Sequence, residues 1–399
     1  MAKKAKVLRF KPKAKPAARK KPVQWIISGD SHVLEPPDLF EKPLAKEYGE
    51  QVPRYLNDAM GLKGKFYFTG LEYIKIDEIV EGDDSTPEKK QLQEELIAAS
   101  MDPYARLKCI DKDGVWAEIL NSTWMLYTMR AKNDRMVEDC CLVYNDWMNE
   151  VVSVNRKRLL ATGMIHMADV NWAVKELERL VKRGFKSVLI NCDARPEWPA
   201  YRDKHYDRFW AAAQSADLPI TLHIITGNAR DPYTLFGEDR GWAWRSTLDV
   251  CSEAGPVVAN DFILSGLMDR FPKLRLILSE FEVSWLPYWL FRVRGLQTQI
   301  GPAMRLPPIK KPIDEYMSRI YHGFVDDAYV DLAIQAAPHT TMMWGSDFPH
   351  TRCTYPNSQR IVKEKLGKLG DKKMADMSYF NAARLYDIEL PKTRAIAAE

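Results

Sequence analysis

Short apolar stretches alternate with helical patterns along the chain from Gln24 onward. This alternation is typical of parallel βα units, in which buried strands are separated by covering helices. The first strand is predicted over residues 25–30, where Trp25 and two isoleucines precede polar residues. The same pattern predicts seven more strands, at 115–120, 162–166, 187–191, 219–223, 274–280, 320–324 and 341–347.

Eight strands separated by helices favour a (β/α)8 TIM barrel, and we expect residues 23–399 to form it. The length of 399 residues also suits two or three smaller domains, but a barrel routinely takes up about 250 residues or more as one unit. The first connection is too long for a plain helix. Within it, residues 65–68 and 72–76 flank Thr69-Gly70 as the two arms of a β-hairpin do. We therefore expect residues 40–105 to form an inserted cap over the barrel mouth.

Charge is distributed unevenly along the chain. Residues 1–22 hold ten Lys and Arg and no acidic residue, whereas the other 377 residues carry 48 basic and 54 acidic side chains. The first segment has three Pro and almost no large apolar residues, so it is predicted to be a disordered, solvated tail. Nucleic acid is not an expected partner, because the remainder is acidic and lacks interleaved aromatic and basic residues.

Other compositional features exclude whole classes of protein. No stretch approaches the ~18 consecutive apolar residues of a membrane-spanning helix, so no membrane is expected. Six Cys are scattered and none lies in a CxxC pair, which favours a reducing cytoplasm over a disulfide framework. The Trp-rich segments 242–244 and 285–289 favour a homo-oligomer, and pairing with a paralogous subunit is the alternative.

Polar residues gather where the predicted strands end, which is where TIM barrels carry their chemistry. The chain has seven His, and five of them lie at or just past a strand end. One such His is usually structural, but five together with three carboxylates favour a shared site. The residues at these ends are Asp30, His32, Asn121, His166, Asn191, His223, Glu280, His322, Asp347 and His350.

Metal binding is the simplest chemical reason for this convergence. Asp30 and His32 are two residues apart, so both point to the same side of an extended segment. Together with His223 and Asp347 they can surround a cation. Imidazoles with carboxylates suit Zn, Fe or Mn, whereas Mg and Ca prefer sets of oxygen ligands. The expected cofactor is a divalent metal, one or two ions per chain.

Three segments resemble motifs of the amidohydrolase-related family, in the branch of the amidohydrolase superfamily near aminocarboxymuconate-semialdehyde decarboxylase. They are Asp-Ser-His-Val-Leu-Glu-Pro at 30–36, Gly-Ser-Asp-Phe-Pro-His at 345–350 and Asn-Ala-Ala-Arg-Leu-Tyr at 381–386. The likeness runs over residues 25–390. It implies a (β/α)8 barrel, a divalent metal, and hydrolysis or decarboxylation of a small, often aromatic or carboxylated compound. The ligands it implies are Asp30, His32, His223 and Asp347.

The chain departs from the family pattern at strand six, where many members of the superfamily have a His. Here the strand runs into Ser279-Glu280-Phe281-Glu282. We expect Glu280 to be a ligand or a general base, and Glu282 to lie at the surface or to share the site. A carboxylate here shifts the metal preference from Zn toward Fe or Mn. Because carboxylates can bridge two ions, an oxygenase with a dinuclear non-haem centre becomes an alternative.

The remaining candidates carry both a structural and a functional interpretation. His166 and His322 end strands where the family has no His, and ligation by either would indicate two metals. His205 either reaches the substrate from a loop or begins a helix, while His339 is expected to be structural. Arg292 is a weak candidate for binding a substrate carboxylate.

The leading hypothesis from the sequence is metal-dependent hydrolysis, in which the cation activates a bound water. Asp347 or Glu280 would take the proton, and His350 or His166 would stabilise the oxyanion. Decarboxylation would instead use the metal to hold a carboxylate beside a phenol or keto group. A non-catalytic subunit beside an active paralogue is the alternative from another class. We expect the cap and the loops at 194–204 and 227–242 to shape the substrate pocket.

Overall fold

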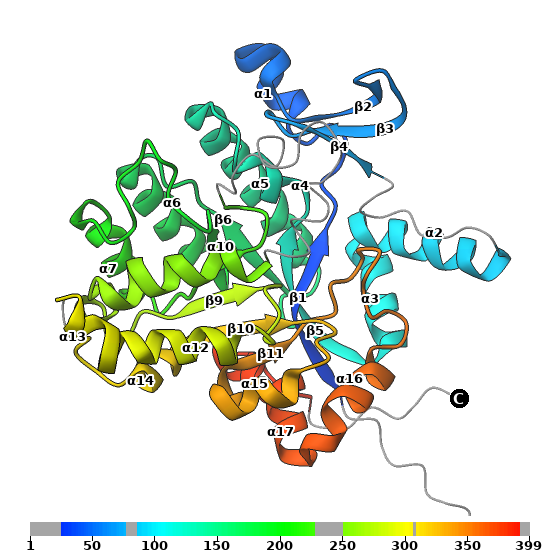
Figure 1. The fold of residues 1–399 in the computed structure, drawn as a ribbon. Helices are drawn as coiled ribbons and strands as arrows, with labels where there is room; N and C mark the ends of the chain where they lie inside the picture. Colours follow the sequence, from blue (N-terminus) through cyan, green and yellow to red (C-terminus); the bar gives the residue numbers. More distant parts are fainter. Residues whose placement is uncertain (1–24, 77–85, 228–249, 306–308, 392–399) are drawn as a thin grey trace, which may run out of the picture.

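Eight parallel strands form the centre of the molecule in this computed structural model, which describes residues 25–76, 86–227, 250–305 and 309–391. Each strand pairs with the next one along the chain, so the order around the sheet is β1-β5-β6-β7-β8-β9-β10-β11 (Figure 1). The predicted (β/α)8 barrel is confirmed. The predicted tail at 1–22, the segment 242–244 and, except for its first residue, the predicted pocket loop at 227–242 lie outside the described residues. The strands are β1 (Ile26–Val33), β5 (Val115–Ser122), β6 (Leu159–Met164), β7 (Ser187–Ile190), β8 (Ile220–His223), β9 (Leu276–Ser279), β10 (Ile320–Phe324) and β11 (Met342–Trp344).

The barrel closes between the last strand and the first by hydrogen bonds beyond the end of β11. The backbone N–H of Asp347 donates to the carbonyl of Asp30 at 3.1 Å, and that of His32 donates to the carbonyl of Phe348 at 2.7 Å. Gly345 makes this approach possible, because a Cβ there would lie 2.7 Å from the Cβ of Asp30. The closing seam therefore passes through two residues of the predicted metal set.

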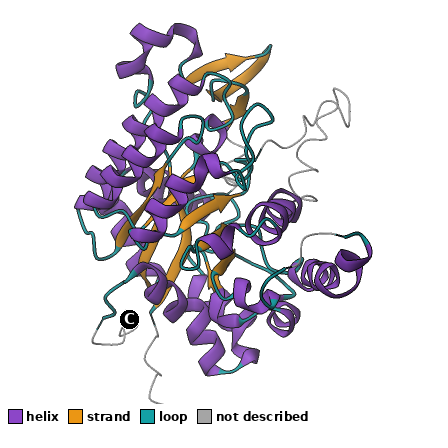
Figure 2. Cartoon of the chain, turned by 90° about the vertical axis from the view of Figure 1, so that its left-hand side faces the viewer, coloured by secondary structure: helices purple, strands orange, loops and turns teal. Residues whose placement is uncertain are grey.

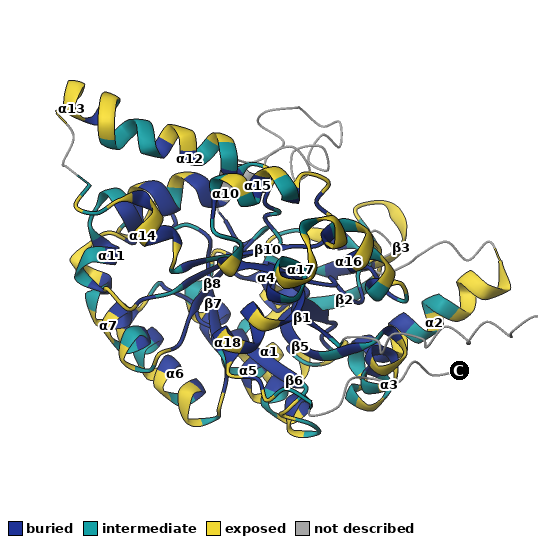
Figure 3. Cartoon of the chain, turned by 90° about the horizontal axis from the view of Figure 1, so that it is seen from below, coloured by how far each residue is buried: buried dark blue, intermediate teal, exposed yellow. Residues whose placement is uncertain are grey.

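Helices surround the strands, which occupy the interior (Figure 2). The eight barrel strands are almost entirely buried, and the helices turn exposed residues outward (Figure 3). None of the helices in the described ranges is long and apolar enough to cross a bilayer. The α-helices are α1 (Glu41–Tyr48), α2 (Pro87–Met101), α3 (Pro103–Asp113), α4 (Trp124–Thr128), α5 (Asp134–Ser153), α6 (Val170–Lys182), α7 (Asp207–Ser215), α10 (Val250–Val257), α11 (Leu267–Arg270), α12 (Leu286–Gly295), α13 (Gly301–Ala303), α14 (Ile313–Met317), α15 (Val330–Ala336), α16 (Ser358–Leu366), α17 (Asp371–Ala375) and α18 (Asn381–Tyr386).

Short 3-10 and π-helical turns connect several of these elements. They are η1 (Gly49–Gln51), η3 (Lys204–Tyr206), η4 (Val258–Leu264), η5 (Leu296–Ile300), η6 (His339–Thr341), η7 (Gly367–Leu369) and η8 (Asp376–Phe380).

Sequence signals explain where the longer helices begin. Asp169 precedes α6, and its side chain accepts hydrogen bonds from the first free backbone N–H groups of that helix, on Asn171 and Trp172. The buried stripe of α6 then recurs every three or four residues, as an amphipathic helix requires.

A separate antiparallel sheet of three strands follows β1, consisting of β2 (Arg54–Ala59), β3 (Leu62–Phe68) and β4 (Tyr73–Lys75). The β3–β4 pair confirms the predicted hairpin. The sheet packs on residues that follow β1 and β5, at their carboxyl ends. The Tyr55 hydroxyl donates to the carbonyl of Glu35 at 3.0 Å, and the Tyr67 ring stacks on Trp124 at 4.6 Å. The role of residues 40–105 as a cap over the mouth stays a prediction.

A buried ion pair joins four parts of the barrel. Arg106 of α3 donates from Nε to Glu118 of β5 at 2.6 Å, and both side chains are about 1% exposed. The same guanidinium donates to the carbonyl of His32 at 2.6 Å and to that of Phe348 at 3.2 Å. Glu118 also accepts from the Ser31 hydroxyl at 2.9 Å. The pair therefore holds both sides of the closing seam, and each polar group of the pair has a partner.

We expect the substitution Arg106→Ala to lower the free energy of unfolding by about 3–5 kcal/mol, because it leaves the buried Glu118 carboxylate without a cationic partner. Arg360→Ala, which breaks an exposed pair with Glu364, is the control and should cost less than about 0.5 kcal/mol. Urea denaturation of both variants measures the difference. Equal losses in the two variants would show that the buried pair has no special role.

Candidate metal centre

Five side chains from four strands meet at the barrel mouth. The Nε2 atom of His32 lies 3.5 Å from Asp30 Oδ1, 3.7 Å from Glu280 Oε2 and 3.5 Å from Asp347 Oδ1. The Nε2 atom of His223 lies 3.7 Å from Asp30 Oδ2 and 3.5 Å from Glu280 Oε2. Asp30, His32, His223 and Glu280 form one group of donor atoms within 4.8 Å of one another. The structure thus brings together all five residues that the sequence nominated as ligands.

The two imidazoles are oriented as metal ligands. Nδ1 of His32 lies 2.8 Å from the carbonyl of Ser122, and Nδ1 of His223 lies 3.0 Å from the carbonyl of Ile224. A carbonyl can only accept, so each Nδ1 carries a hydrogen, and in the neutral ring each Nε2 presents a lone pair to the group. Neither Nε2 nor Asp30 Oδ2 has a hydrogen-bond partner among the described residues. Buried acceptors without partners are costly, and a cation would satisfy all three.

The charge balance of the group also suits a cation. Burial alone would raise the pKa of Asp30, but the His223 and His32 imidazoles outweigh it and hold the pKa well below its usual value. Burial opposes a charge on His32, yet Glu280, Asp30 and Asp347 raise its pKa to about 9. Asn121, another predicted strand-end residue, orients Asp30 by donating to Oδ1 at 2.7 Å. The carboxylates therefore attract positive charge to this point.

Glu280 and Asp347 sit on unusual backbone. Their φ angles are 64° and 56°, in the left-handed region that residues other than glycine seldom adopt. Such backbone strain is concentrated at functional sites, where the surrounding fold maintains it. Burial raises the pKa of both carboxyl groups; it brings that of Asp347 to about 7, and the neighbouring Asp347 adds to the rise at Glu280. Asp347 can therefore both give and take a proton near neutral pH.

His350 belongs to the same mouth, in a second donor group with His32 and Asp347. Its Nδ1 lies 2.7 Å from Asp347 Oδ1, and its ring stacks on that of His32 at 4.1 Å. Burial, reinforced by His32, lowers its pKa to about 3, so the ring is neutral. Its Nε2 lies 3.0 Å from the hydroxyl of Thr123, a contact that the sequence analysis missed. The only signal for Thr123 was its position directly after a predicted strand.

The two other strand-end histidines lie outside these donor groups. Nε2 of His166 lies 3.0 Å from Asp134 Oδ1, which also pairs with Arg195. His322 is in register with Leu278 and Met342, and its ring meets the edge of Trp285, just before α12, at 6.4 Å. No described residue forms a hydrogen bond with either nitrogen of His322.

The remaining candidates belong to neither donor group. Glu282, which follows β9, accepts a hydrogen bond from the backbone N–H of Val325 at 3.3 Å, so its side chain is held at the end of β10. His205 is exposed in η3, against the ring of Tyr206. Arg292 is exposed on α12, where it lines a surface cleft with residues of η5 and α14. His339 pairs with Asp376 at 3.2 Å, as expected for a structural histidine.

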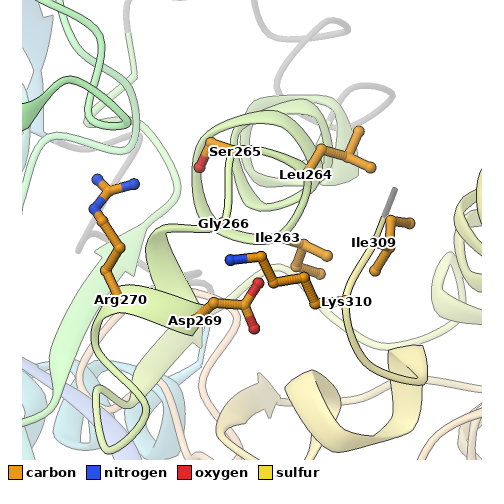
Figure 4. A pocket seen from close by; sticks show the side chains of 8 residues that line it. All are labelled: Ile263, Leu264, Ser265, Gly266, Asp269, Arg270, Ile309 and Lys310. Carbon is orange, nitrogen blue, oxygen red and sulfur yellow. The ribbon is translucent and has the colours of Figure 1, made fainter. Parts of the chain in front are cut away.

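A surface cavity of about 320 Å³ lies between η4, α11 and the segment that leads to α14 (Figure 4). Two of its three charged side chains are engaged: Asp269 accepts from the hydroxyl of Tyr316, and Arg270 pairs with Asp207, while Lys310 is the third. None of the metal donors lines this cavity or the cleft beside Arg292. The chemistry-bearing residues are therefore those of the barrel mouth.

The fold and the site together define the class of protein. A family model described as amidohydrolase matches residues 124–388, which is more than half of the chain, so the chain belongs to the amidohydrolase family. This result confirms the resemblance seen in the three sequence motifs.

Two individual proteins that match this chain in sequence are both decarboxylases by name. The chain is 28% identical to a gamma-resorcylate decarboxylase from Polaromonas sp. over 221 residues, which cover 54% of this chain and 66% of the relative. It is 25% identical to the decarboxylase orsB from Emericella nidulans over 273 residues, covering 64% and 78% of the two chains. The match to the first relative thus spans slightly less than two thirds of that protein.

Solved structures share the fold over almost the whole chain. The amidohydrolase map2389c from Mycobacterium avium subsp. paratuberculosis superposes with a TM-score of 0.74 at 18% identity, covering 92% of this chain and 99% of the other. A dihydroxybenzoic acid decarboxylase from Polaromonas sp. JS666, solved with manganese and 2-nitroresorcinol, gives a TM-score of 0.65 at 18% identity, covering 92% and 98%. At this identity the likeness establishes the fold alone.

We expect His223→Ala to lose bound metal, because it removes one of two imidazole donors. Loss of an outer-shell partner alone lowers metal affinity by roughly 10–100-fold, so loss of a direct donor should lower the affinity at least as much. The metal content after purification with Mn²⁺, measured by plasma mass spectrometry, should therefore fall well below that of the wild type. His339→Ala, which removes a histidine remote from the donors, is the control and should keep the wild-type content. Retention of metal by His223→Ala would show that the ion binds elsewhere.

Burial lowers the pKa of His322 to about 3, against about 6.5 in an unfolded chain. The unfolded state therefore binds an extra proton between these values, so this histidine costs stability as the pH falls below 6.5. His322→Leu should remove this penalty and recover about 2 kcal/mol at pH 5 relative to its effect at pH 8. Denaturation curves at both pH values test this, with exposed His205→Leu as the unchanged control. An unaltered pH dependence in His322→Leu would mean that His322 is not buried in its neutral form.

Proposed function

We propose that this chain is a metal-dependent decarboxylase of aromatic carboxylic acids. The observation that carries the proposal is the buried convergence of Asp30, His32, His223 and Glu280, with both imidazole Nε2 atoms directed at one point. The two curated relatives described above are decarboxylases, and one of them acts on a resorcylate by its name. We therefore place decarboxylation ahead of hydrolysis, which the sequence alone favoured.

One divalent cation per chain fits the donors. Each Nε2 has a single lone pair, and His32 is common to both donor groups, so it can serve only one ion. Two carboxylates, those of Asp30 and Glu280, lie beside the two imidazoles, and a donor set with this share of oxygen favours Mn²⁺ over Zn²⁺. Manganese is also the ion in the structure of the Polaromonas decarboxylase.

When bound, the cation supplies Lewis-acid anchoring for the carboxylate of the substrate and an adjacent oxygen. The residues of the chain then have to deliver one proton. Decarboxylation breaks the bond between the ring carbon and the carboxylate carbon, and the electron pair stays on the ring as CO₂ leaves. We assign the protonation of that carbon to Asp347, because its carboxyl lies at the mouth beside the donor group, with Oδ1 3.5 Å from Nε2 of His32. The neutral ring of His350 lies beside this carboxyl, with Nδ1 2.7 Å from Asp347 Oδ1.

The alternatives from the sequence receive less support. A dinuclear oxygenase would use Glu280 as a bridge, yet its Oε2 lies 3.7 and 3.5 Å from the two histidine Nε2 atoms of one group. A non-catalytic subunit has no need for a complete donor set, and here none of the five residues is missing.

We expect Mn²⁺-loaded protein to convert a 2-hydroxylated benzoic acid, such as 2,6-dihydroxybenzoate, to the phenol and CO₂. Asp347→Asn should lower kcat by about 10²–10⁴-fold, the usual contribution of a positioned general acid. The four donors of the first group remain in this variant, so most of the metal should be retained. Chromatography of the product and CO₂ release measure the rates, and exposed Asp326→Asn is the control. Hydrolysis of esters or amides without any decarboxylation of hydroxybenzoates would overturn the proposal.

A further inference from the structure

A row of three polar side chains crosses the barrel mouth at the ends of neighbouring strands. Met164 of β6 is in register with Leu189 of β7, and Ile190 of β7 is in register with Leu222 of β8. The hydrogen bond from Ile165 N to Leu189 O, at 3.0 Å, extends the first ladder beyond β6. The next row is therefore His166, Asn191 and His223.

Residues in register on parallel strands point to the same face, and neighbouring strands are about 4.8 Å apart. His223 points to the metal donors. The contacts of Asn191 place it at the mouth, because its amide donates to the carbonyls of Met129, after α4, and of Thr226, after β8. The ring of His166 lies next to the Asn191 side chain, one strand further from His223.

The orientation of the Asn191 amide is determined by its donors. Its Nδ2 donates to the carbonyl of Met129 at 3.0 Å and to that of Thr226 at 3.2 Å. These two bonds use both hydrogens of the amide, so the other atom is the acceptor Oδ1. This Oδ1 is buried and has no hydrogen-bond partner among the described residues.

The ring of His166 is held in the tautomer that leaves Nδ1 bare. Burial would raise the pKa of Asp134, but His166 and Arg195 outweigh it and keep the carboxylate ionised. An ionised carboxylate only accepts, so Nε2 of His166 donates to Asp134 Oδ1 at 3.0 Å. Burial lowers the pKa of His166 itself, so the ring is neutral and Nδ1 is an acceptor. The Asn191 side chain lies within hydrogen-bonding reach of the ring, but both of its amide hydrogens are used elsewhere, so it offers Nδ1 no hydrogen, and no other described residue does.

Two buried acceptors therefore lie beside the metal centre with no donor from the described residues to satisfy them. We propose that His166 Nδ1 and Asn191 Oδ1 form a substrate subsite that recognises a hydrogen-bond donor on the aromatic ring, a hydroxyl group above all. The inference rests on the proposed function, because the cation is what would anchor the carboxylate of the same molecule. A subsite with acceptors alone selects a hydroxyl over a methyl ether, which has no hydrogen to donate.

Binding of non-reacting acids to the Mn²⁺-loaded protein tests the subsite. The probes are 3-hydroxybenzoate and 4-hydroxybenzoate, each compared with its methyl ether by isothermal titration calorimetry. We expect at least one hydroxy acid to bind about tenfold or more tightly than its ether, since the ether leaves both acceptors unpaired. Equal affinities within both pairs, or no binding of any probe, would overturn the proposal.

Two variants test whether the preference for a hydroxy acid over its methyl ether arises from Asn191 and His166. Asn191→Leu and His166→Phe should each reduce it to about threefold or less, with metal content unchanged. His322→Phe is the matched control, because it replaces another buried histidine at a strand end that does not belong to the row. Loss of the preference in the control as well would show a general packing effect and would refute the assignment.

The tautomer is tested without any substitution, which covers the case in which the variants fail to fold. Nitrogen-15 NMR of the histidine side chains should show His166 neutral at pH 7, with its proton on Nε2. A doubly protonated ring would donate from Nδ1 and would overturn the proposal. If the protein decarboxylates hydroxybenzoates but binds hydroxy acids and their ethers equally well, only the subsite proposal is refuted. If it prefers the hydroxy acids but decarboxylates none of them, only the decarboxylase proposal is refuted.

Discussion

The Arg106–Glu118 ion pair is the interaction on which the rest of the site depends. One guanidinium binds a buried carboxylate and also the backbone carbonyls of His32 and Phe348, which lie on the two sides of the barrel seam. Asp30 and Asp347 stand on either side of that seam, and their backbones are joined by a hydrogen bond. An ion pair far from water is costly unless each polar group has a partner, and here the barrel backbone supplies those partners. The contact that closes the barrel also holds the donors in position.

Histidines at the strand ends show how one residue type serves different purposes. His32 and His223 donate from Nδ1 to carbonyls, so their Nε2 lone pairs face the candidate ion. His166 donates from Nε2 to a carboxylate, so Nδ1 is the free acceptor. His322 faces Trp285 instead, on the side of α12. The atom that each ring uses in its hydrogen bond, rather than the presence of a histidine, separates the candidate metal ligands from the proposed substrate contact.

The position and order of all eight strands could be predicted because each is a buried apolar run followed by polar residues, and parallel strands follow one another in chain order. The hairpin at β3 and β4 was visible for the same reason, while β2 was not, because its residues are half-exposed and mostly polar. At the site, Asp30, His32, His223, Glu280 and Asp347 were nominated from strand ends and motifs. Thr123 was missed because a threonine after a strand carries no chemical signal until a partner such as His350 is placed beside it.

The sequence by itself determined the barrel, the rim that carries the chemistry and the set of donor residues, because these follow from local periodicity and from residue type. Tertiary structure alone decided which strand-end histidines direct a ring nitrogen into the same donor group, since the side-chain direction past a strand end depends on the backbone of the turn. The positive φ angles of Glu280 and Asp347 are an example, as they are maintained by contacts with distant segments. The tautomer of each ring was likewise decided by acceptors remote in sequence, such as the carbonyl of Ser122 for His32 and the carboxylate of Asp134 for His166.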